Sequence, residues 1–213
     1  FLAFDTRKLV IPERTIFFAL RGKLKDGHHF IQKAYNQGVR EFVVERGFDT
    51  SAFVNAHFVE VDDVLAYLQQ IALAHRQQFN LQAFGITGSN GKTTTKELIH
   101  TVLKTQYEVI ATEGNLNNHI GVPLTLLRLT PDIEFAVVEM GANHPGEIAQ
   151  LAEISQPDYG LITNFGKAHL EGFGSLEGVV KAKSELYEHL KNNHGVIFAN
   201  GDDDKMTCQL SGY

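Results

Sequence analysis

The most informative stretch of this chain is Gly85-Ile86-Thr87-Gly88-Ser89-Asn90-Gly91-Lys92-Thr93-Thr94-Thr95. It follows an apolar run, 81–86, and opens a segment of helical character. A glycine-rich turn that ends in Gly-Lys-Thr between a strand and a helix is a phosphate-binding loop. Its backbone N–H groups point at phosphate oxygens, the lysine reaches the terminal phosphates, and the next hydroxyl can bind Mg²⁺. The strict motif has glycine five residues before Gly91, where this chain has Ile86. The sequence therefore predicts a variant P-loop rather than an ordinary turn.

Composition indicates a globular protein. The 213 residues are 43% hydrophobic, enough for one large or two modest domains. A net charge of −6 argues against a non-specific grip on nucleic acid, so no nucleic-acid partner is expected. The single cysteine, Cys208, excludes an intramolecular disulfide framework and a cysteine-rich zinc site.

The compartment and the chain ends also give expectations. A reducing cytoplasm is the simplest location for a chain with one cysteine. Because the sequence has no apolar run of spanning length and no signal peptide, we expect no membrane insertion. The chain begins Phe1-Leu2 without methionine and stops at Gly212-Tyr213, and we expect both ends to be cuts from a longer protein.

Two blocks of secondary structure are predicted. In the first block, strands are expected at 15–20, 41–45 and 57–61, with helices at 30–37 and from Val64 onward. We place a domain boundary near Asn80, which gives an amino-terminal α/β domain over 1–80.

The second block, 81–213, alternates strands with helices. Alternation with continuous apolar strands predicts an α/β domain with a mostly parallel sheet flanked by helices on both faces. Ligands in such folds bind beyond the carboxyl ends of the strands, so the loops that begin at Thr87, Ala111, Met140 and Thr163 are expected to meet there. The predicted strands are 83–87, 107–111, 135–140, 159–163 and 196–199, and the predicted helices are 93–104, 122–129, 146–154 and 176–190.

Three of these loops carry candidate ligands. The loop after 107–111 contains Asn115 and Asn118, and it is either a ligand loop rich in amide donors or a long polar turn. The next strand brings Glu139 to the same edge. A carboxylate that faces a P-loop holds Mg²⁺ in many nucleotide sites, although an exposed glutamate at a strand end would fit the pattern too. His144 is interpreted as shaping its turn. His169 is a candidate metal ligand or phosphate contact, or else a structural histidine.

Weaker signals lie elsewhere. Lys181 and Lys183 are taken by default as a solvated face of the helix 176–190. In the first block, the hydroxyl of Thr6 beside Arg7 suits an anion. The glycines of the run 22–30 suit a shaped loop, and both of these segments could equally be simple turns.

Taken together, the motifs resemble the Mur ligases, which are ATP-dependent amide ligases of peptidoglycan precursor synthesis. Within the family, the Ala-Asn-His-Pro-Gly-Glu run at 142–147 and the His-Leu-Glu-Gly-Phe-Gly run at 169–174 are similar to the ligase that adds D-alanyl-D-alanine to UDP-N-acetylmuramoyl-tripeptide. The resemblance rests on the runs 87–94, 114–123, 139–148 and 168–175, and in the first block on 5–7, 17–22 and 26–28.

The resemblance implies a fold and an activity. Residues 1–80 would be a UDP-substrate-binding domain and 81–213 an incomplete ATP-binding central domain, with the carboxy-terminal ligase domain absent. The complete protein would act through an acyl-phosphate intermediate, whereas this chain alone would be inactive or nearly so.

The resemblance also implies cofactors and site residues. ATP and two Mg²⁺ ions would bind, with Lys183 modified by CO₂ to a carbamate, and catalytic roles would fall to Lys92, His169 and Lys183. The implied ATP-binding residues are Thr87, Gly88, Ser89, Asn90, Gly91, Lys92, Thr93 and Thr94. The implied metal ligands are Thr93, Glu139, His169 and carbamylated Lys183, and the implied UDP-substrate contacts are Thr6, Arg7, Asn115 and Asn118.

Three alternatives stay open. The protein could be another ligase of the superfamily, such as one that adds glutamate to folate or diaminopimelate to a muramoyl dipeptide. It could be a P-loop switch, although the combination of Glu139, His169 and Lys183 argues against that class. The chain as it stands could also be a non-catalytic module that binds a nucleotide or a UDP-sugar.

Overall fold

The computed structural model describes residues 1–22, 25–166 and 170–210. The chain divides into two compact units, Phe1–Leu68 and Gln69–Tyr213. The division falls inside helix α2 (Val64–Arg76), whereas the sequence places the boundary after this helix, near Asn80. A single continuous helix thus carries the chain from one unit into the next.

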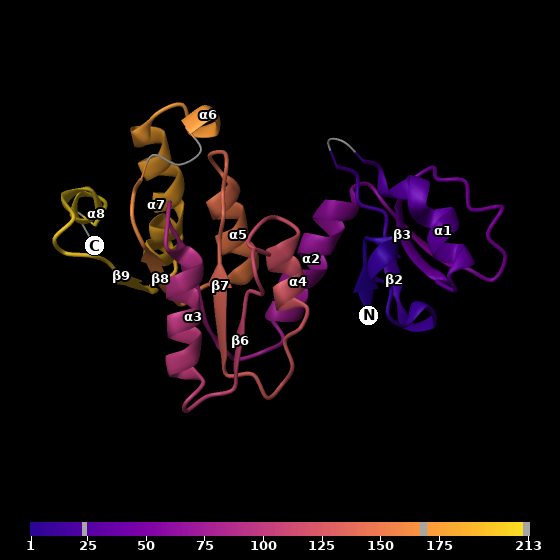
Figure 1. Ribbon diagram of the computed structural model, residues 1–213, viewed down its shortest axis with the longest axis horizontal. Coiled ribbons are helices and arrows are strands. Elements are labelled where there is room, and N and C mark those ends of the chain that lie inside the picture. Colours follow the sequence, from indigo (N-terminus) through magenta and orange to yellow (C-terminus); the bar gives the residue numbers. More distant parts are fainter. Residues whose placement is uncertain (23–24, 167–169, 211–213) are drawn as a thin grey trace. The chain divides into compact units, whose positions relative to one another are not determined.

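The described residues of the first unit form a four-stranded sheet in which neighbouring strands are parallel. Helix α1 (Ile31–Asn36) follows the short 3₁₀ turn η3 (Gly27–Phe30), and both lie beside the strands in Figure 1. Phe17, Ile31 and Phe42 are almost wholly buried and form the centre of a small core. The strands, in spatial order, are β1 (Leu2–Ala3), β2 (Ile16–Phe18), β3 (Glu41–Glu45) and β4 (His57–Val61). Two further 3₁₀ turns are η1 (Thr6–Lys8) and η2 (Pro12–Arg14).

In the second unit, the described residues form a five-stranded sheet with the order β6-β7-β5-β8-β9. Every pairing between these named strands is parallel, which confirms the predicted sheet. The strands are β5 (Gln82–Thr87), β6 (Val109–Ala111), β7 (Phe135–Glu139), β8 (Tyr159–Ile162) and β9 (Val196–Phe198). The helices that follow α2 are α3 (Lys92–Leu103), α4 (Gly121–Leu126), α5 (Glu147–Ser155), α6 (Leu170–Phe173), α7 (Leu176–Asn192) and α8 (Asp204–Cys208).

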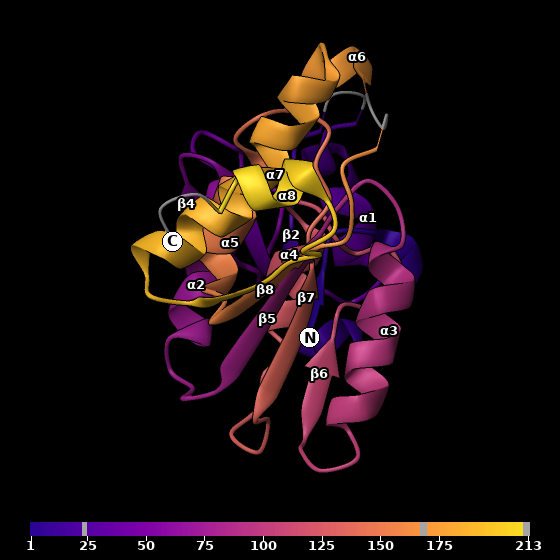
Figure 2. The ribbon, with the colours of Figure 1, turned by 90° about the vertical axis from the view of Figure 1, so that its left-hand side faces the viewer.

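Helices cover the two faces of this sheet unequally. Figure 2 shows α3 on one side of the strands and α5 on the other. On the α5 side, α7 packs so closely that a Cβ on Gly160 would overlap Leu190, and a large apolar core fills this side. On the α3 side, the rings of Phe84, Tyr159 and Phe198, from β5, β8 and β9, pack against one another in stacked and tilted arrangements, with Phe198 still 48% exposed. The predicted cover on both faces therefore holds for the inner strands, whereas the edge strand β9 is only half covered.

The chain changes direction across the sheet at β5. From β5 it runs through α3 to β6 on one side, and later it runs from β7 through α5 to β8 on the other side. The carboxyl end of β5 is therefore the switch point at which ligands of open α/β sheets bind. The predicted P-loop begins there, at Thr87.

Candidate functional site

The P-loop forms a tight turn between β5 and α3. Gly88 and Gly91 have φ values of +143° and +79°, in a region that favours glycine. Gly91 is the N-cap of α3 and, because glycine has no side chain, it supplies no side-chain capping hydrogen bond. The first backbone N–H groups of a helix have no intrahelical acceptor and carry a partial positive charge. The loop therefore directs unpaired donors and positive potential into the space beyond β5, as an anion requires.

A second loop, 163–166, holds the P-loop in place from the end of β8. Asn164 accepts from the N–H of Ser89 through its carbonyl at 3.0 Å and from the N–H of Asn90 through Oδ1 at 3.2 Å. The hydroxyl of Thr163 donates to the carbonyl of Asn90 at 2.6 Å. The sequence assigns no role to Thr163 or Asn164. The one feature of the sequence that could have indicated their role is their position, because they follow β8, which lies beside β5 and ends at the same edge of the sheet.

A cavity of about 360 Å³ opens beside the P-loop in the second unit. Its lining includes Lys92 from α3 and Lys183 from α7. The polar loops that follow β6 and β7 line it as well. Lys92 is partly buried, and its Nζ donates to the carbonyl of Gly88 at 2.9 Å, so the side chain folds back over the loop. The lining residues are Lys92, Asn115, Asn117, Asn118, His119, Gly141, Ala142, Asn143, Glu147, Gln150, Leu151 and Lys183.

Two of the predicted phosphate and metal contacts lie apart from this cavity. Thr93 and Thr94 are exposed and line a separate hollow along the outside of α3, together with Glu97, Leu98 and Thr101. The hydroxyl of Thr93 is therefore accessible at the start of α3 but does not face the cavity that contains Lys92 and Lys183.

Glu139 is buried at the end of β7, so it is not an exposed residue at a strand end. Its side chain is 1% exposed, and Oε1 accepts a hydrogen bond from the Nδ2 of Asn117 at 2.8 Å. Among the described residues, its Oε2 is one of three buried side-chain polar atoms that lack a hydrogen-bond partner. A buried carboxylate oxygen without a partner is costly, and a bound cation would satisfy it. Glu139 does not itself line the cavity, but its partner Asn117 and its near neighbour Gly141 do. The residues present therefore fit a divalent cation.

Lys183 departs from the default expectation of a solvated lysine. Its side chain is 2% exposed, and its Nζ lies 5.8 Å from the centre of the Phe173 ring, whereas Lys181 is exposed. Burial, and after it the positive charge of Lys92, lowers the pKa of Lys183 from 10.5 to about 8. A substantial fraction of this amine is therefore uncharged slightly above neutral pH, when it is a nucleophile.

Predictions were made for two histidines of this region, His144 and His169, and the structure describes only His144. His169 lies outside the described residues, so its predicted metal role stays a prediction. Within the described part of the chain, no cluster of three or more His, Cys, Asp or Glu side chains is arranged to hold a metal. His144 lies in a turn closed by Glu147, whose carboxylate accepts from the N–H groups of Asn143 and His144 at 2.6 and 3.2 Å. This arrangement agrees with the interpretation that His144 shapes its turn.

In the first unit, the predicted anion site of Thr6 and Arg7 is organised around Asp5. The guanidinium of Arg7 forms an ion pair with the Asp5 carboxylate at 2.7 Å. Hydrogen bonds from the side chain and then the backbone N–H of Arg7 hold the pKa of Asp5 well below its usual range. Thr6 is buried, whereas the Arg7 side chain is 75% exposed. As the chain stands, Arg7 is thus held by a carboxylate and the Thr6 hydroxyl is withdrawn from solvent.

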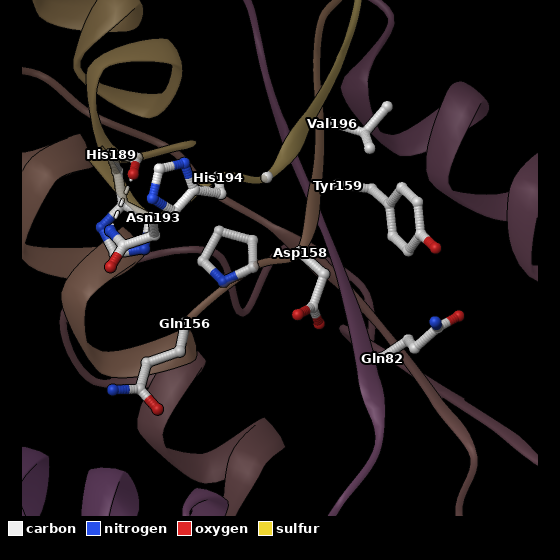
Figure 3. Close-up of a pocket in the computed structure, with 10 residues that line it drawn as sticks. Gln82, Gln156, Asp158, Tyr159, His189, Asn193, His194 and Val196 are labelled. Atoms are coloured by element: carbon white, nitrogen blue, oxygen red, sulfur yellow. Dashed lines mark hydrogen bonds between the residues drawn. The ribbon is translucent and has the colours of Figure 1, made fainter. Parts of the chain in front are cut away.

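A second cavity, of about 340 Å³, lies at the opposite edge of the five-stranded sheet (Figure 3). The cavity is lined by Gln82 and Val196, the first residues of β5 and β9, by Asp158 just before β8, and by His189 and His194 at and just beyond the end of α7, all labelled in Figure 3. Ligands of such sheets bind at the carboxyl ends of the strands. The cavity beside Lys92 is therefore the candidate site, and the other is not.

No helix among the described segments combines the length and the apolar character needed to cross a membrane.

Comparisons with known proteins agree with this reading of the second unit. A family model described as the Mur ligase middle domain matches residues 86–211. The chain is 43% identical, over its whole length, to the UDP-N-acetylmuramoyl-tripeptide–D-alanyl-D-alanine ligase of Bacillus subtilis, of which it covers 46%. It is 42% identical, over 94% of its length, to the ligase of the same name from Escherichia coli, of which it covers 43%. The chain thus spans less than half the length of these relatives.

Solved structures give the same result. MurF from Acinetobacter baumannii matches with a TM-score of 0.90 and 36% identity over 99% of this chain and 45% of that one. MurF from Thermotoga maritima, in complex with ADP, matches with a TM-score of 0.88 and 33% identity over all of this chain and 48% of that one. Because the family model covers more than half of the residues, and because the relatives align along nearly the whole chain, this protein belongs to the Mur ligase family.

Proposed function

We propose that the complete protein is an ATP-dependent ligase that joins the carboxyl group of UDP-N-acetylmuramoyl-tripeptide to the amino group of D-alanyl-D-alanine. The observation that carries the proposal is the cavity that brings Lys92 and Lys183 together beside the P-loop, lined also by Asn117, which bonds the buried carboxylate of Glu139. The named relatives support the choice of substrates. In this proposal residues 1–80 bind the UDP-substrate, and 81–213 form most of the ATP-binding domain.

The chemistry requires activation of a carboxylate, which is a poor acyl donor because oxide would have to leave. Transfer of the terminal phosphoryl group of ATP to the carboxylate gives an acyl phosphate and ADP. The amine then attacks the acyl carbon, and phosphate leaves from the tetrahedral intermediate as the amide forms. Lys92 and the first N–H groups of α3 would orient the phosphates and offset their charge, so catalysis is mainly positioning and electrostatic stabilisation. The ADP complex of the Thermotoga relative supports nucleotide binding by this protein.

Two Mg²⁺ ions belong to the proposal. Glu139, through Oε2, and Thr93 would hold the first, and His169 and carbamylated Lys183 would hold the second. The ions supply charge neutralisation for the transferring phosphoryl group. To form the carbamate, the uncharged amine of Lys183 attacks CO₂, an N–C bond forms and a proton is released. The buried position and lowered pKa of Lys183 support this step, because they increase the uncharged form.

Contacts with the UDP-substrate are proposed for Thr6 and Arg7 in the first unit and for Asn115 and Asn118 in the second. Asn115 and Asn118 line the cavity beside Lys92. Asn118 also accepts through Oδ1 from the N–H groups of Ile120 and Gly121 at 3.1 and 2.9 Å, so it caps the start of α4. In this proposal the long polar loop after β6 acts both as a ligand loop and as a polar turn that caps α4.

The decisive experiment measures ADP release by the complete protein with UDP-N-acetylmuramoyl-tripeptide and a series of amines. The proposal predicts release that depends on D-alanyl-D-alanine. Release that depends instead on glutamate with a folate, or on diaminopimelate with a muramoyl dipeptide, would assign the protein to another ligase of the superfamily. Release without any amine or acid acceptor would favour a P-loop switch.

For the 213-residue chain taken alone, we propose a non-catalytic nucleotide and UDP-sugar binder, because it spans less than half of its relatives. Titration with Mg·ADP and with UDP-N-acetylmuramoyl-tripeptide should show weak binding of each, and amide formation should be absent. Robust amide formation by this chain would contradict the proposal.

A further inference from the structure

We propose that Asn117 is a positioning residue that leaves Glu139 a single free oxygen, so that Glu139 binds Mg²⁺ through Oε2 alone. The Nδ2 of Asn117 donates to the Oε1 of Glu139 at 2.8 Å, while Oε2 is buried and has no hydrogen-bond partner among the described residues. The inference rests on the proposed function, because it concerns how Glu139 meets the metal of the nucleotide site.

The side chain of Asn117 is held in its orientation by the neighbouring backbone. Its carbonyl accepts from the N–H of Gly141 at 2.7 Å, and its own N–H donates to the carbonyl of Asn115 at 2.8 Å. Its amide also packs against Gly141, where a Cβ would approach the Asn117 Oδ1 to 2.8 Å. The close approach that glycine allows at 141 therefore keeps the amide directed at Glu139.

Glu139 is fixed from its other side as well. Its backbone N–H donates to the hydroxyl of Thr112 at 3.0 Å, and the carbonyl of Thr112 in turn accepts from the Nζ of Lys96, a lysine with no exposed side-chain surface. The end of β7, which carries the Glu139 carboxylate, is therefore linked through Thr112 to Lys96 of α3. With its backbone anchored and Oε1 bonded, the orientation of Oε2 follows.

A single available oxygen matters for the choice of cation. Mg²⁺ demands near-ideal octahedral geometry at about 2.1 Å, whereas Ca²⁺ is larger, accepts more oxygens and often takes both oxygens of one carboxylate. A hydrogen bond from Asn117 to Oε1 competes with two-oxygen coordination. We therefore infer that Asn117 favours Mg²⁺ over Ca²⁺ at this site.

The test compares Mg²⁺ and Ca²⁺ binding to the complete protein in the presence of ADP, by isothermal titration calorimetry. Two variants remove the amide donor: Asn117→Ala, and Asn117→Asp, which keeps the shape of the side chain in case the alanine variant fails to fold. Mg²⁺ affinity should fall roughly 10-fold in Asn117→Ala, as for other groups that orient a metal ligand. In both variants Ca²⁺ affinity should fall less or rise, so the ratio of Ca²⁺ to Mg²⁺ affinity increases.

Asn193→Ala is the matched control. Its Nδ2 donates only to the carbonyl of His189 one turn back, at the edge of the sheet opposite the P-loop, so the affinity ratio should stay at the wild-type value. A wild-type ratio in both Asn117 variants, with normal Mg·ADP binding, would overturn the positioning role alone. Absence of Mg²⁺-dependent ADP binding in the wild-type protein would overturn the proposed function and this inference together.

Discussion

Gly88 and Thr163 are in such close contact that a methyl group built on Gly88 would overlap the hydroxyl oxygen of Thr163. The two residues lie beyond the ends of neighbouring strands, β5 and β8, and the N–H of Thr163 donates to the carbonyl of Thr87 at 2.9 Å. The P-loop therefore owes its shape both to its own glycines and to the loop packed behind it.

Gly88→Ala should disrupt this arrangement. The new Cβ overlaps Thr163, and the φ of +143° at this position is unfavourable for alanine. We expect the free energy of unfolding to fall by about 2 kcal/mol or more, and Mg·ADP affinity to fall with it, because the loop must move. Urea denaturation and nucleotide titration check both. Gly201→Ala is the control, since no atom lies within 4 Å of the added Cβ, and similar results for the two variants would contradict the prediction.

Lys92→Ala should slow turnover strongly while leaving the fold intact. Lys92 is partly buried and makes one hydrogen bond, to the carbonyl of Gly88, so its loss should change the free energy of unfolding by less than about 0.5 kcal/mol. Loss of its charge should reduce ADP release by the complete protein by roughly 10²- to 10³-fold, the scale for a missing electrostatic donor. Lys181→Ala, at an exposed position of α7, should release ADP normally. Normal release by Lys92→Ala would remove the P-loop lysine from the mechanism.

Lys183→Met should change how stability depends on pH. The pKa of Lys183 is about 8 in the folded protein and near 10.5 when unfolded, so between these values the unfolded chain binds more protons and the free energy of unfolding rises with pH. Below pH 8 the buried cation costs stability by an amount on the order of 3 kcal/mol. Methionine fills a similar volume without a charge.

The variant should therefore be more stable than the wild type near pH 7, and this advantage should disappear as the pH approaches 10.5. Thermal unfolding in CO₂-free buffer across this range provides the measurement, because carbamate formation would otherwise replace the cation. A stability difference that stays constant with pH would show that Lys183 titrates normally.

Glu139→Gln should stabilise the metal-free protein and remove its response to Mg²⁺. The substitution replaces a buried carboxylate, whose Oε2 has no partner, by a neutral group that can still accept from Asn117. We expect the free energy of unfolding to rise by about 1–2 kcal/mol without metal, and the stabilisation by Mg·ADP to be lost. Glu153→Gln, at an exposed position of α5, should retain the response to Mg·ADP. An unchanged Mg²⁺ response in Glu139→Gln would exclude this carboxylate as a ligand.

Much of the fold was accessible from sequence, because local patterns specify it. The expected strands at 41–45 and 57–61 coincide with β3 and β4, and the P-loop lies between a strand and a helix as its glycines require. The two-residue strand β1 was not predicted, since Leu2–Ala3 is too short to show alternation and is held by pairing with β2. The structure divides the chain inside α2, whereas the sequence places the boundary near Asn80, because helical periodicity carries no information about which core a residue joins.

The candidate site was only partly accessible in this way. Position at a strand end made Glu139 a candidate and the Gly-Lys-Thr run made Lys92 one, because the order of segments in a parallel sheet places both at the carboxyl ends of the strands. Lys181 and Lys183 look alike in the sequence, yet only the packing of α7 buries Lys183 beneath the loops and lowers its pKa.

By itself, the sequence determined a parallel α/β unit with a phosphate-binding loop, since alternating apolar segments and a glycine turn are local properties of the chain. Only the tertiary structure decided which side chains lie beside that loop and which groups they contact. The bond from Asn117 to Glu139 joins residues 22 positions apart, and the contacts of Asn164 with the P-loop join residues 74 positions apart. Such partners are selected by the spatial order of the strands, which brings distant loops to one edge of the sheet and leaves one carboxylate oxygen without a partner.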